Sequence, residues 1–148
     1  MEEERNPAPG RILGLDVGAR RIGIAVSDPL GLTAQGLPTL QRRNRRYDHS
    51  ELQKLIREYS VKEIVVGNPL RMSGESGAQA EKMAAFAAQL RQEFSLPIHL
   101  WDERLSTAEA HRLLDETEIR DARRKEVIDK MAAVLILQSF LDARATMR

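Results

Sequence analysis

The sequence has no cysteine and few aromatic residues: its 148 residues include one Trp, two Tyr and three Phe. The lack of cysteine excludes a thiolate nucleophile, an iron–sulfur cluster and a zinc site with cysteine ligands. So few aromatic side chains also argue against a surface on which successive bases stack. Any chemistry must therefore come from oxygen and nitrogen groups, and the composition suits the reducing cytoplasm.

The sequence also has no apolar run of the roughly 18 residues that a membrane helix requires. Its acidic, proline-rich start, MEEERNPAPG, lacks the apolar centre of a signal peptide. We therefore expect a cytoplasmic protein that does not bind membranes. The formal net charge is +1, from 23 Lys and Arg against 22 Asp and Glu, so the overall charge neither indicates nor excludes nucleic acid.

The length is that of one domain, which can bury a core without a disulfide. We expect a single domain at residues 11–142, a disordered tail at residues 1–10 and a C-terminal tail at residues 143–148. Apolar runs predict strands at residues 11–17, 21–27, 33–41, 62–66 and 97–102. Helical spacing predicts helices at residues 48–59, 77–94, 106–114 and 126–141.

Turn residues and charged residues mark where these elements end. Gly18 and Ala19 join the first two strands as a hairpin, and Gly67, Asn68 and Pro69 are expected to end the fourth strand. Pro38 indicates that the third strand lies at an edge of the sheet.

The order of these elements predicts a mixed α/β sheet of five strands. Consecutive strands can pair antiparallel, whereas strands separated by a helix pair parallel through right-handed crossovers. The simplest result is the strand order 3-2-1-4-5, with the first three strands antiparallel and helices on both faces. Asp48 and Glu51 predict a capping box for the first helix, and the charged stretch 115–125 is expected to be a loose connection.

Asp16 stands at the carboxyl end of the first strand, after the apolar run Ile12 to Leu15. Sites in such sheets form where the strand order changes direction, which here is beside this strand. Burying an unpaired carboxylate costs several kcal/mol, so a divalent metal or a phosphate-handling site would be needed to compensate the charge. Alternatively, Asp16 only caps the turn at Gly18, since Asp and Gly are common turn formers.

Four blocks of the sequence resemble, in the same order, the signature blocks of the YqgF (RuvX) family: GLDVGARRIGIAVSD, VVGNPLRMSGESGAQA, DERLSTAEA and VIDKMAAVLILQSFLD. The resemblance spans residues 11–142. It implies an RNase H-like fold and a nuclease, that is, a hydrolase acting on ester bonds. Members of the family are described as Holliday junction resolvases and are implicated in trimming the 5′ end of precursor 16S ribosomal RNA during ribosome biogenesis.

The family's acidic set falls on Asp16, Glu103 and Asp129, which the resemblance makes the catalytic residues and the metal ligands. Phosphodiester hydrolysis needs an activated water and a stabilised leaving oxygen, and paired Mg²⁺ or Mn²⁺ ions can supply both. Such cations take oxygen ligands, so the expected cofactor is Mg²⁺ or Mn²⁺ held by these carboxylates.

Like Asp16, the other two carboxylates also have an ordinary structural explanation. Glu103 follows Asp102, and either could face solvent or be the ligand. In the predicted sheet its strand lies about 10 Å from the first strand, so its side chain must reach inward. Asp129 could be a first-turn acid that stabilises the dipole of its helix.

Basic residues are expected around the same edge of the sheet. The candidates for binding nucleic acid are Arg20, Arg21, Arg71 and Arg104. Contacts of this kind hold phosphates without reading the base sequence. The run at residues 41–46 contains four arginines and is more typical of a solvated face than of a binding site. His99, inside an apolar run, is expected to be structural.

The favoured hypothesis is a metal-dependent nuclease whose partner is nucleic acid: precursor ribosomal RNA, single-stranded DNA or branched DNA. One alternative is a Holliday junction resolvase, which must cut two strands symmetrically and so predicts a homodimer, whereas an RNA-trimming nuclease could be a monomer. A second alternative is a catalytically silent RNA-binding factor in ribosome assembly. A third, an actin-like or sugar-kinase ATPase, needs two such domains, and this length supplies one.

Overall fold

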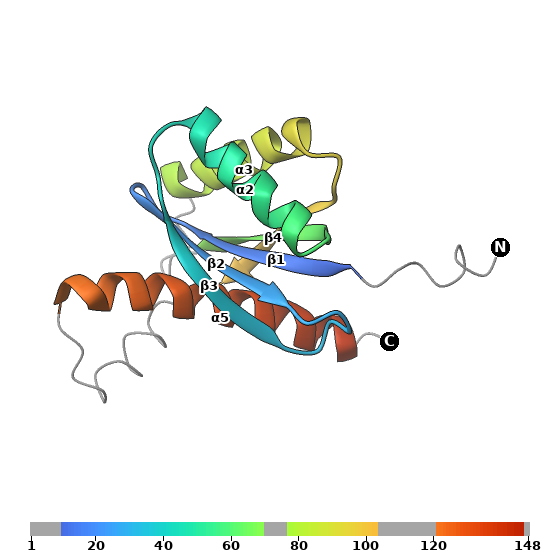
Figure 1. Ribbon diagram of the computed structural model, residues 1–148. Coiled ribbons are helices and arrows are strands. Elements are labelled where there is room, and N and C mark those ends of the chain that lie inside the picture. The colour runs from blue at the N-terminus through green and yellow to red at the C-terminus, as the bar shows by residue number, and fades with distance from the viewer. Residues whose placement is uncertain (1–9, 70–76, 104–120, 147–148) are drawn as a thin grey trace.

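The structure is a computed structural model that describes residues 10–69, 77–103 and 121–146. These residues form a five-stranded sheet with the strand order β3-β2-β1-β4-β5 (Figure 1). The strands are β1 (Arg11–Val17), β2 (Arg21–Ser27), β3 (Ala34–Gln41), β4 (Val61–Pro69) and β5 (Ile98–Glu103). The helices are α2 (Arg45–Glu58), α3 (Gly77–Glu93) and α5 (Asp121–Thr146).

The pairing of the strands follows the prediction. β1 pairs antiparallel with β2, and β2 pairs antiparallel with β3. β4 is parallel to both β1 and β5. The predicted order and the mixed character of the sheet are therefore confirmed.

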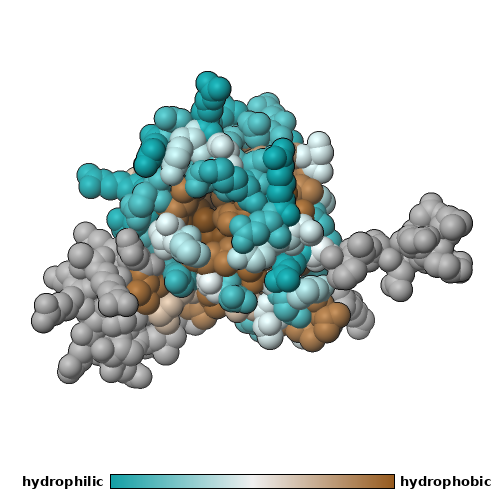
Figure 2. Space-filling model, in the orientation of Figure 1, coloured by the Kyte–Doolittle hydropathy of each residue, from teal (hydrophilic) through white to brown (hydrophobic). Residues whose placement is uncertain are grey.

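Helices cover both faces of the sheet, with α2 and α3 on one face and α5 on the other (Figure 1). Because alternate residues of a strand point to opposite faces, the apolar core has two parts, one on each face of the sheet. On the side of α2 and α3, the cluster includes Leu13, Leu15, Ile22, Ile24 and Leu90. On the side of α5, a smaller cluster contains Ile12, Ala25, Val65, Ala133 and Leu137. Figure 2 shows that apolar surface reaches solvent between α2 and the edge strand β3.

The first helix begins earlier than the sequence predicted. Asn44 is the N-cap of α2, where its side-chain oxygen accepts a hydrogen bond from the N–H of Tyr47 (2.8 Å). The predicted capping box of Asp48 and Glu51 is wrong, because both side chains have other partners. Asp48 is buried and binds Arg42 and the N–H of Arg43, whereas Glu51 pairs with Lys54.

Two further boundaries differ from the prediction. β4 does not end at residue 66, because Gly67, Asn68 and Pro69 continue to pair with β5. α5 is longer at both ends than the predicted 126–141, so part of the charged stretch expected to be a connection belongs to this helix. The helix predicted at residues 106–114 lies outside the described residues. In the part of the chain that the structure describes, no helix is both long and apolar enough to span a bilayer.

Candidate active site

Asp16 lies near the carboxyl end of the central strand β1, on the face covered by α5. The preceding residue on that face, Gly14, is so close to α5 that an added Cβ would lie 2.8 Å from Cβ of Leu137. Asp16 itself pairs across the sheet with Gly23 of β2. The first strand of the sheet therefore presents the Asp16 carboxylate to the long C-terminal helix.

Gly23 is the position at which α5 approaches the sheet most tightly near this carboxylate. A Cβ at residue 23 would lie 2.0 Å from the backbone carbonyl oxygen of Asp129. No side chain larger than a hydrogen fits there without a shift of backbone. Because Gly23 is the partner of Asp16, this close contact brings Asp129 beside Asp16, although the two residues are far apart in the sequence.

The Asp129 carboxylate makes ionisation of Asp16 more costly. Burial, and then the negative charge of Asp129, raise the pKa of Asp16 from 3.8 to about 6. None of the described residues forms a hydrogen bond or an ion pair with the Asp16 carboxylate. Asp129 is better compensated, because Nε of Arg21 lies 2.6 Å from its Oδ2 atom. The site thus holds a carboxylate whose charge has no partner within the described protein.

Most of the predicted site residues that can be traced lie at this edge of the sheet. Arg20 is exposed in the turn between β1 and β2, and Arg21 bonds to Asp129. Glu103 is the last residue of β5, where it pairs with Pro69, and its side chain lies outside the described part of the structure. Arg71 and Arg104 lie outside the described residues altogether.

The neighbour of Glu103 faces the other side of the sheet. Asp102 is exposed and accepts a hydrogen bond from the side-chain amide of Asn68 (3.3 Å). The alternate positions of β5 face α5, since the ring of His99 lies 5.3 Å from that of Phe140 and the Trp101 indole bonds to Ser139. Asp102 is therefore separated by the sheet from the pair formed by Asp16 and Asp129.

The donor chemistry of the pair suits a hard divalent cation. Carboxylate oxygens are the ligands that Mg²⁺ and Mn²⁺ prefer, and Mg²⁺ often uses only one or two of them, with waters and substrate phosphate completing its shell. Within the described ranges, no group of three or more His, Cys, Asp or Glu side chains could hold a metal ion. Asp16 and Asp129 are two of the three residues predicted to bind a metal, and the structure brings these two together.

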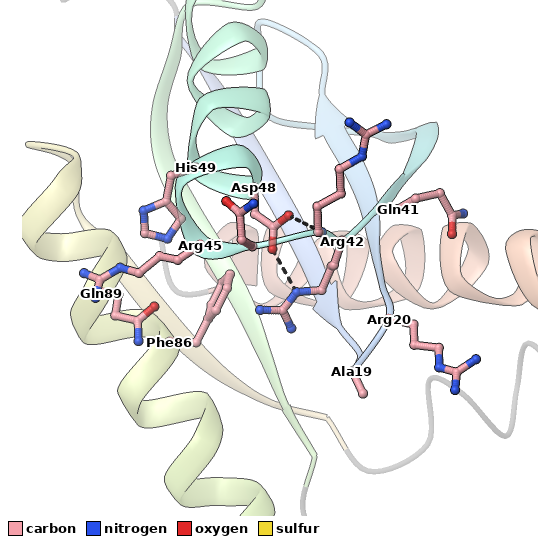
Figure 3. A pocket seen from close by; sticks show the side chains of 11 residues that line it. Ala19, Arg20, Gln41, Arg42, Arg45, Asp48, His49, Phe86 and Gln89 are labelled. Atoms are coloured by element: carbon pink, nitrogen blue, oxygen red, sulfur yellow. Dashed lines mark hydrogen bonds and ion pairs between the residues drawn. The ribbon is translucent and has the colours of Figure 1, made fainter.

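A cavity of about 570 Å³ opens on the other side of the β1–β2 turn, facing α2 and α3 (Figure 3). We call it the arginine cavity, because Arg20, Arg42, Arg43 and Arg45 line it. Three of these arginines come from the run that the sequence assigned to a solvated face. Sequence reasoning missed the cavity because the residues that close it, Asp48 and Phe86, lie on two different helices.

His49 and His99 have partners typical of structural histidines. His49 is buried between Phe86 and Phe94 and lies 3.3 Å from Oε1 of Glu93. His99 bonds to Glu63 at 2.9 Å, as expected for a residue inside the sheet.

Comparison with known proteins identifies relatives along almost the whole chain. Residues 10–143 match the RuvX family, which is described as Holliday junction resolvase. A protein from Koribacter versatilis (strain Ellin345) is 53% identical, over 96% of this chain and 93% of the relative. A protein from Moorella thermoacetica is also 53% identical, over 89% of this chain and 94% of the relative. Both relatives carry the name "Putative pre-16S rRNA nuclease".

Solved structures of low sequence identity share the fold. Thermus thermophilus RuvC, in complex with a Holliday junction substrate, matches with a TM-score of 0.54 and 14% identity, over 92% of this chain and 96% of that one. The Fowlpox virus resolvase, in complex with Holliday junction DNA, matches with a TM-score of 0.56 and 9% identity, over 90% and 98%. The predicted RNase H-like fold is confirmed by these neighbours.

Proposed function

The chain belongs to the RuvX family, and we propose that it is a metal-dependent nuclease that cleaves phosphodiester bonds at the carboxyl end of β1. The observation that carries the proposal is that Asp129 of α5 lies beside Asp16 of β1, with no cationic side chain beside Asp16 among the described residues. A protein that gains nothing else from this arrangement would lose stability by it, because burial and like charge both oppose ionisation. We propose the 5′ end of precursor 16S ribosomal RNA as the substrate, on the names of the relatives.

Each carboxylate has a distinct part in this proposal. Asp16, on the central strand, and Asp129, on the helix that packs against it, hold the divalent cations. The cations, when bound, supply an activated water and stabilise the leaving oxygen. With a pKa of about 6, Asp16 is mostly ionised at pH 7 and offers its oxygen atoms as ligands. Arg21 holds Asp129 in place through its Nε atom and stands where a substrate phosphate would approach.

We assign the third ligand to Glu103 rather than to Asp102. Successive positions of a strand alternate between the two faces of its sheet. Position 103 therefore belongs with Trp101, which contacts α5, and Asp102 belongs with Asn68 on the opposite face. We also propose Arg20, Arg71 and Arg104 as contacts to the backbone of the nucleic acid.

The test compares the cleavage of three substrates by the wild type and by single variants. The substrates are RNA with the precursor 16S 5′ leader, single-stranded DNA and a four-way DNA junction, each with Mg²⁺ and with Mn²⁺. The variants are Asp16→Asn and Asp129→Asn, with Asp142→Asn as the matched control, because Asp142 is an exposed acid of α5 that bonds only to Gln138 among the described residues.

We expect the wild type and Asp142→Asn to cleave the RNA, and both site variants to lose cleavage with their thermal transitions intact. Wild-type cleavage by Asp16→Asn would remove this carboxylate from the mechanism. Metal-independent binding of RNA without cleavage of any substrate would instead identify a catalytically silent assembly factor.

A second candidate substrate is the four-way junction, which the description of the family favours. A resolvase cuts two strands symmetrically and therefore acts as a two-fold dimer. Paired, symmetric cuts in the junction, together with a dimer mass in sedimentation, would select this activity. Cleavage of the RNA leader by a monomer would select the first.

A further inference from the structure

The arginine cavity carries an excess of positive charge that the fold does not use. Its lining contains four arginines and one carboxylate, Asp48. Arg42 and Arg43 contact that carboxylate, the first through Nε at 3.1 Å and the second through its backbone N–H at 3.0 Å. Arg20 and Arg45 form no ion pair with any side chain in the described ranges. The cavity therefore attracts an anion.

Arg42 is held in a fixed orientation at the centre of this cavity. Besides Asp48, it bonds through Nη1 to the carbonyl oxygen of Gly18 (2.7 Å), and its guanidinium lies 5.6 Å from the ring centroid of Phe86. These hydrogen bonds use two of the five N–H donors of the guanidinium, so the others remain for a ligand. In Figure 3, Arg45 and Arg20 lie on opposite sides of Arg42. An anion would meet a guanidinium whose conformational freedom is already restricted.

The cavity suits a phosphate rather than a base. Phe86 and His49, its aromatic residues, are 6% and 5% exposed, so neither offers a face on which a base could stack. Guanidinium groups bind phosphate oxygens with paired hydrogen bonds, and such contacts do not depend on the base sequence of the nucleic acid. The first N–H groups of α2, at Arg45 and Arg46, add partial positive charge at the same place.

The turn between β1 and β2 links this cavity to the carboxylates. Arg20 and Arg21 are consecutive residues, yet Arg20 lines the cavity, and Arg21 reaches Asp129 on the α5 side. A strand of nucleic acid that is cleaved beside Asp129 therefore needs only to cross this turn to reach the cavity. The two sites lie on opposite faces of the sheet and meet at one edge of the molecule.

We propose that the arginine cavity binds a backbone phosphate of the substrate strand, separate from the phosphate that is cleaved, so that the strand crosses the β1–β2 turn. This inference rests on the proposed nuclease function and adds a second point of attachment to it. The affinity for the substrate should therefore depend on the length of the strand and not on its base sequence.

The test measures the binding of fluorescent single-stranded RNA of about 4 and about 16 nucleotides, lengths that bracket common single-strand sites. Binding is followed by anisotropy at several salt concentrations, with Ca²⁺ in place of Mg²⁺. The variant is Arg45→Gln, and the matched control is Arg46→Gln, which removes the same charge from the next residue of α2. Arg46 is exposed and does not line the cavity. Thermal melting checks that both variants fold.

We expect Arg45→Gln to weaken the binding of the long RNA about five- to tenfold and to reduce the magnitude of its log–log salt slope by about 0.7, the value for one phosphate contact with a single strand. The short RNA should bind as to the wild type, and Arg46→Gln should change neither affinity by more than about twofold. Adding Arg20→Gln to Arg45→Gln should enlarge the loss for the long RNA.

Equal effects of Arg45→Gln and Arg46→Gln on the long RNA would overturn the assignment of the cavity. A free nucleotide is the other source of phosphate. If AMP raises the melting temperature of the wild type but not of Arg45→Gln, and RNA length has no effect, the ligand is a small molecule and the backbone assignment is overturned. Cleavage of the short RNA, lost in Asp16→Asn, tests the nuclease proposal separately from either outcome.

Discussion

Two acidic residues under the same helix have pKa values that move in opposite directions. Asp16 and Glu63 both lie on the face of the sheet that α5 covers, Asp16 toward the carboxyl end of β1 and Glu63 near the start of β4. The pKa of Asp16 is raised to about 6, whereas that of Glu63 is lowered from 4.5 to about 2. The difference comes from what α5 places beside each of them.

At Glu63, α5 supplies a cation. Arg144 donates to both carboxylate oxygens, at 2.9 and 2.8 Å, and His99 lies 2.9 Å from Oε1. The hydrogen bond from Arg144 is the main cause of the lowered pKa, followed in the same direction by the bond from His99. Both carboxylate oxygens of Glu63 therefore have partners within the protein. This ion pair contributes to stability and does not need a ligand to compensate its charge.

At Asp16, the same helix supplies a second carboxylate instead. The close contact of α5 with Gly23 positions Asp129 beside Asp16. Because this contact is between backbone atoms, the two acids cannot separate without a shift of the helix. A charge arrangement that opposes folding is typical of a functional site, where a ligand supplies the missing partner. The contrast between the two ends of the helix therefore separates an acid with a charged partner, Glu63, from the acid that we propose to be functional, Asp16.

The largest effect should come from replacing the unpaired acid. Asp16→Asn removes a proposed metal ligand, and we expect cleavage to fall by at least about 100-fold. The melting temperature at pH 7 should stay level or rise, because the variant also removes a buried charge that Asp129 repels. Single-turnover cleavage and calorimetry measure the two quantities. A large drop in melting temperature would mean that Asp16 is a structural residue like Glu63.

A substitution at Gly23 should disrupt the close contact that positions Asp129. Gly23→Ala places a methyl group against backbone, so α5 must move, and we expect about 3 kcal/mol of destabilisation with a loss of cleavage. The comparison variant is Gly36→Ala on β3, where the added Cβ would lie 2.5 Å from Cγ of Lys130, a side-chain atom rather than a backbone atom. We expect about 1 kcal/mol there and normal cleavage. Equal effects in urea unfolding would show that the contact at Gly23 is not special.

The pH dependence of stability should report Asp16 directly. A carboxyl whose pKa is raised in the folded state binds more protons than in the unfolded chain between pH 3.8 and about 6. The free energy of unfolding of the wild type should therefore decrease as pH rises through this window, by about 2 kcal/mol relative to Asp16→Asn. Glu63 keeps its full contribution above pH 4.5 and loses it only as pH falls toward about 2. Parallel curves for the two proteins between pH 4.5 and 6.5 would contradict the raised pKa.

The smallest effect on stability and cleavage is expected at Glu63, whose carboxylate is paired with Arg144 and His99. Glu63→Gln weakens the contacts with Arg144 and His99, and because Arg144 is 33% exposed, we expect a loss of only about 1 kcal/mol. Cleavage should be unchanged, since this ion pair lies away from Asp16. Urea unfolding and the cleavage assay of the RNA leader check both statements. Loss of cleavage by this variant would contradict the distinction between Glu63 as a structural acid and Asp16 as a functional one.

Much of the architecture could be predicted from local sequence patterns. Alternation in residues 21–27 and Gly18 after the first strand were enough to define the central hairpin, and the helices between later strands required parallel pairing. The boundaries were less predictable, because Asn44 rather than Asp48 caps α2, and Asn68 continues a strand. At α2, the nearby residues Arg42 and Arg43 occupy the Asp48 carboxylate, whereas Asn68 continues β4 because it pairs with the distant residue Asp102.

By itself, the sequence determined the strand order, the position of Asp16 at the end of the central strand, and the resemblance that pointed to Asp129 and Glu103. Only the tertiary structure decided which charges meet. It set Asp129 rather than an arginine beside Asp16, set Arg144 beside Glu63, and turned an arginine-rich run into the wall of a cavity. The physical reason is that periodicity acts over a few residues, whereas a pKa depends on whatever group the packing of a distant helix brings within a few ångströms.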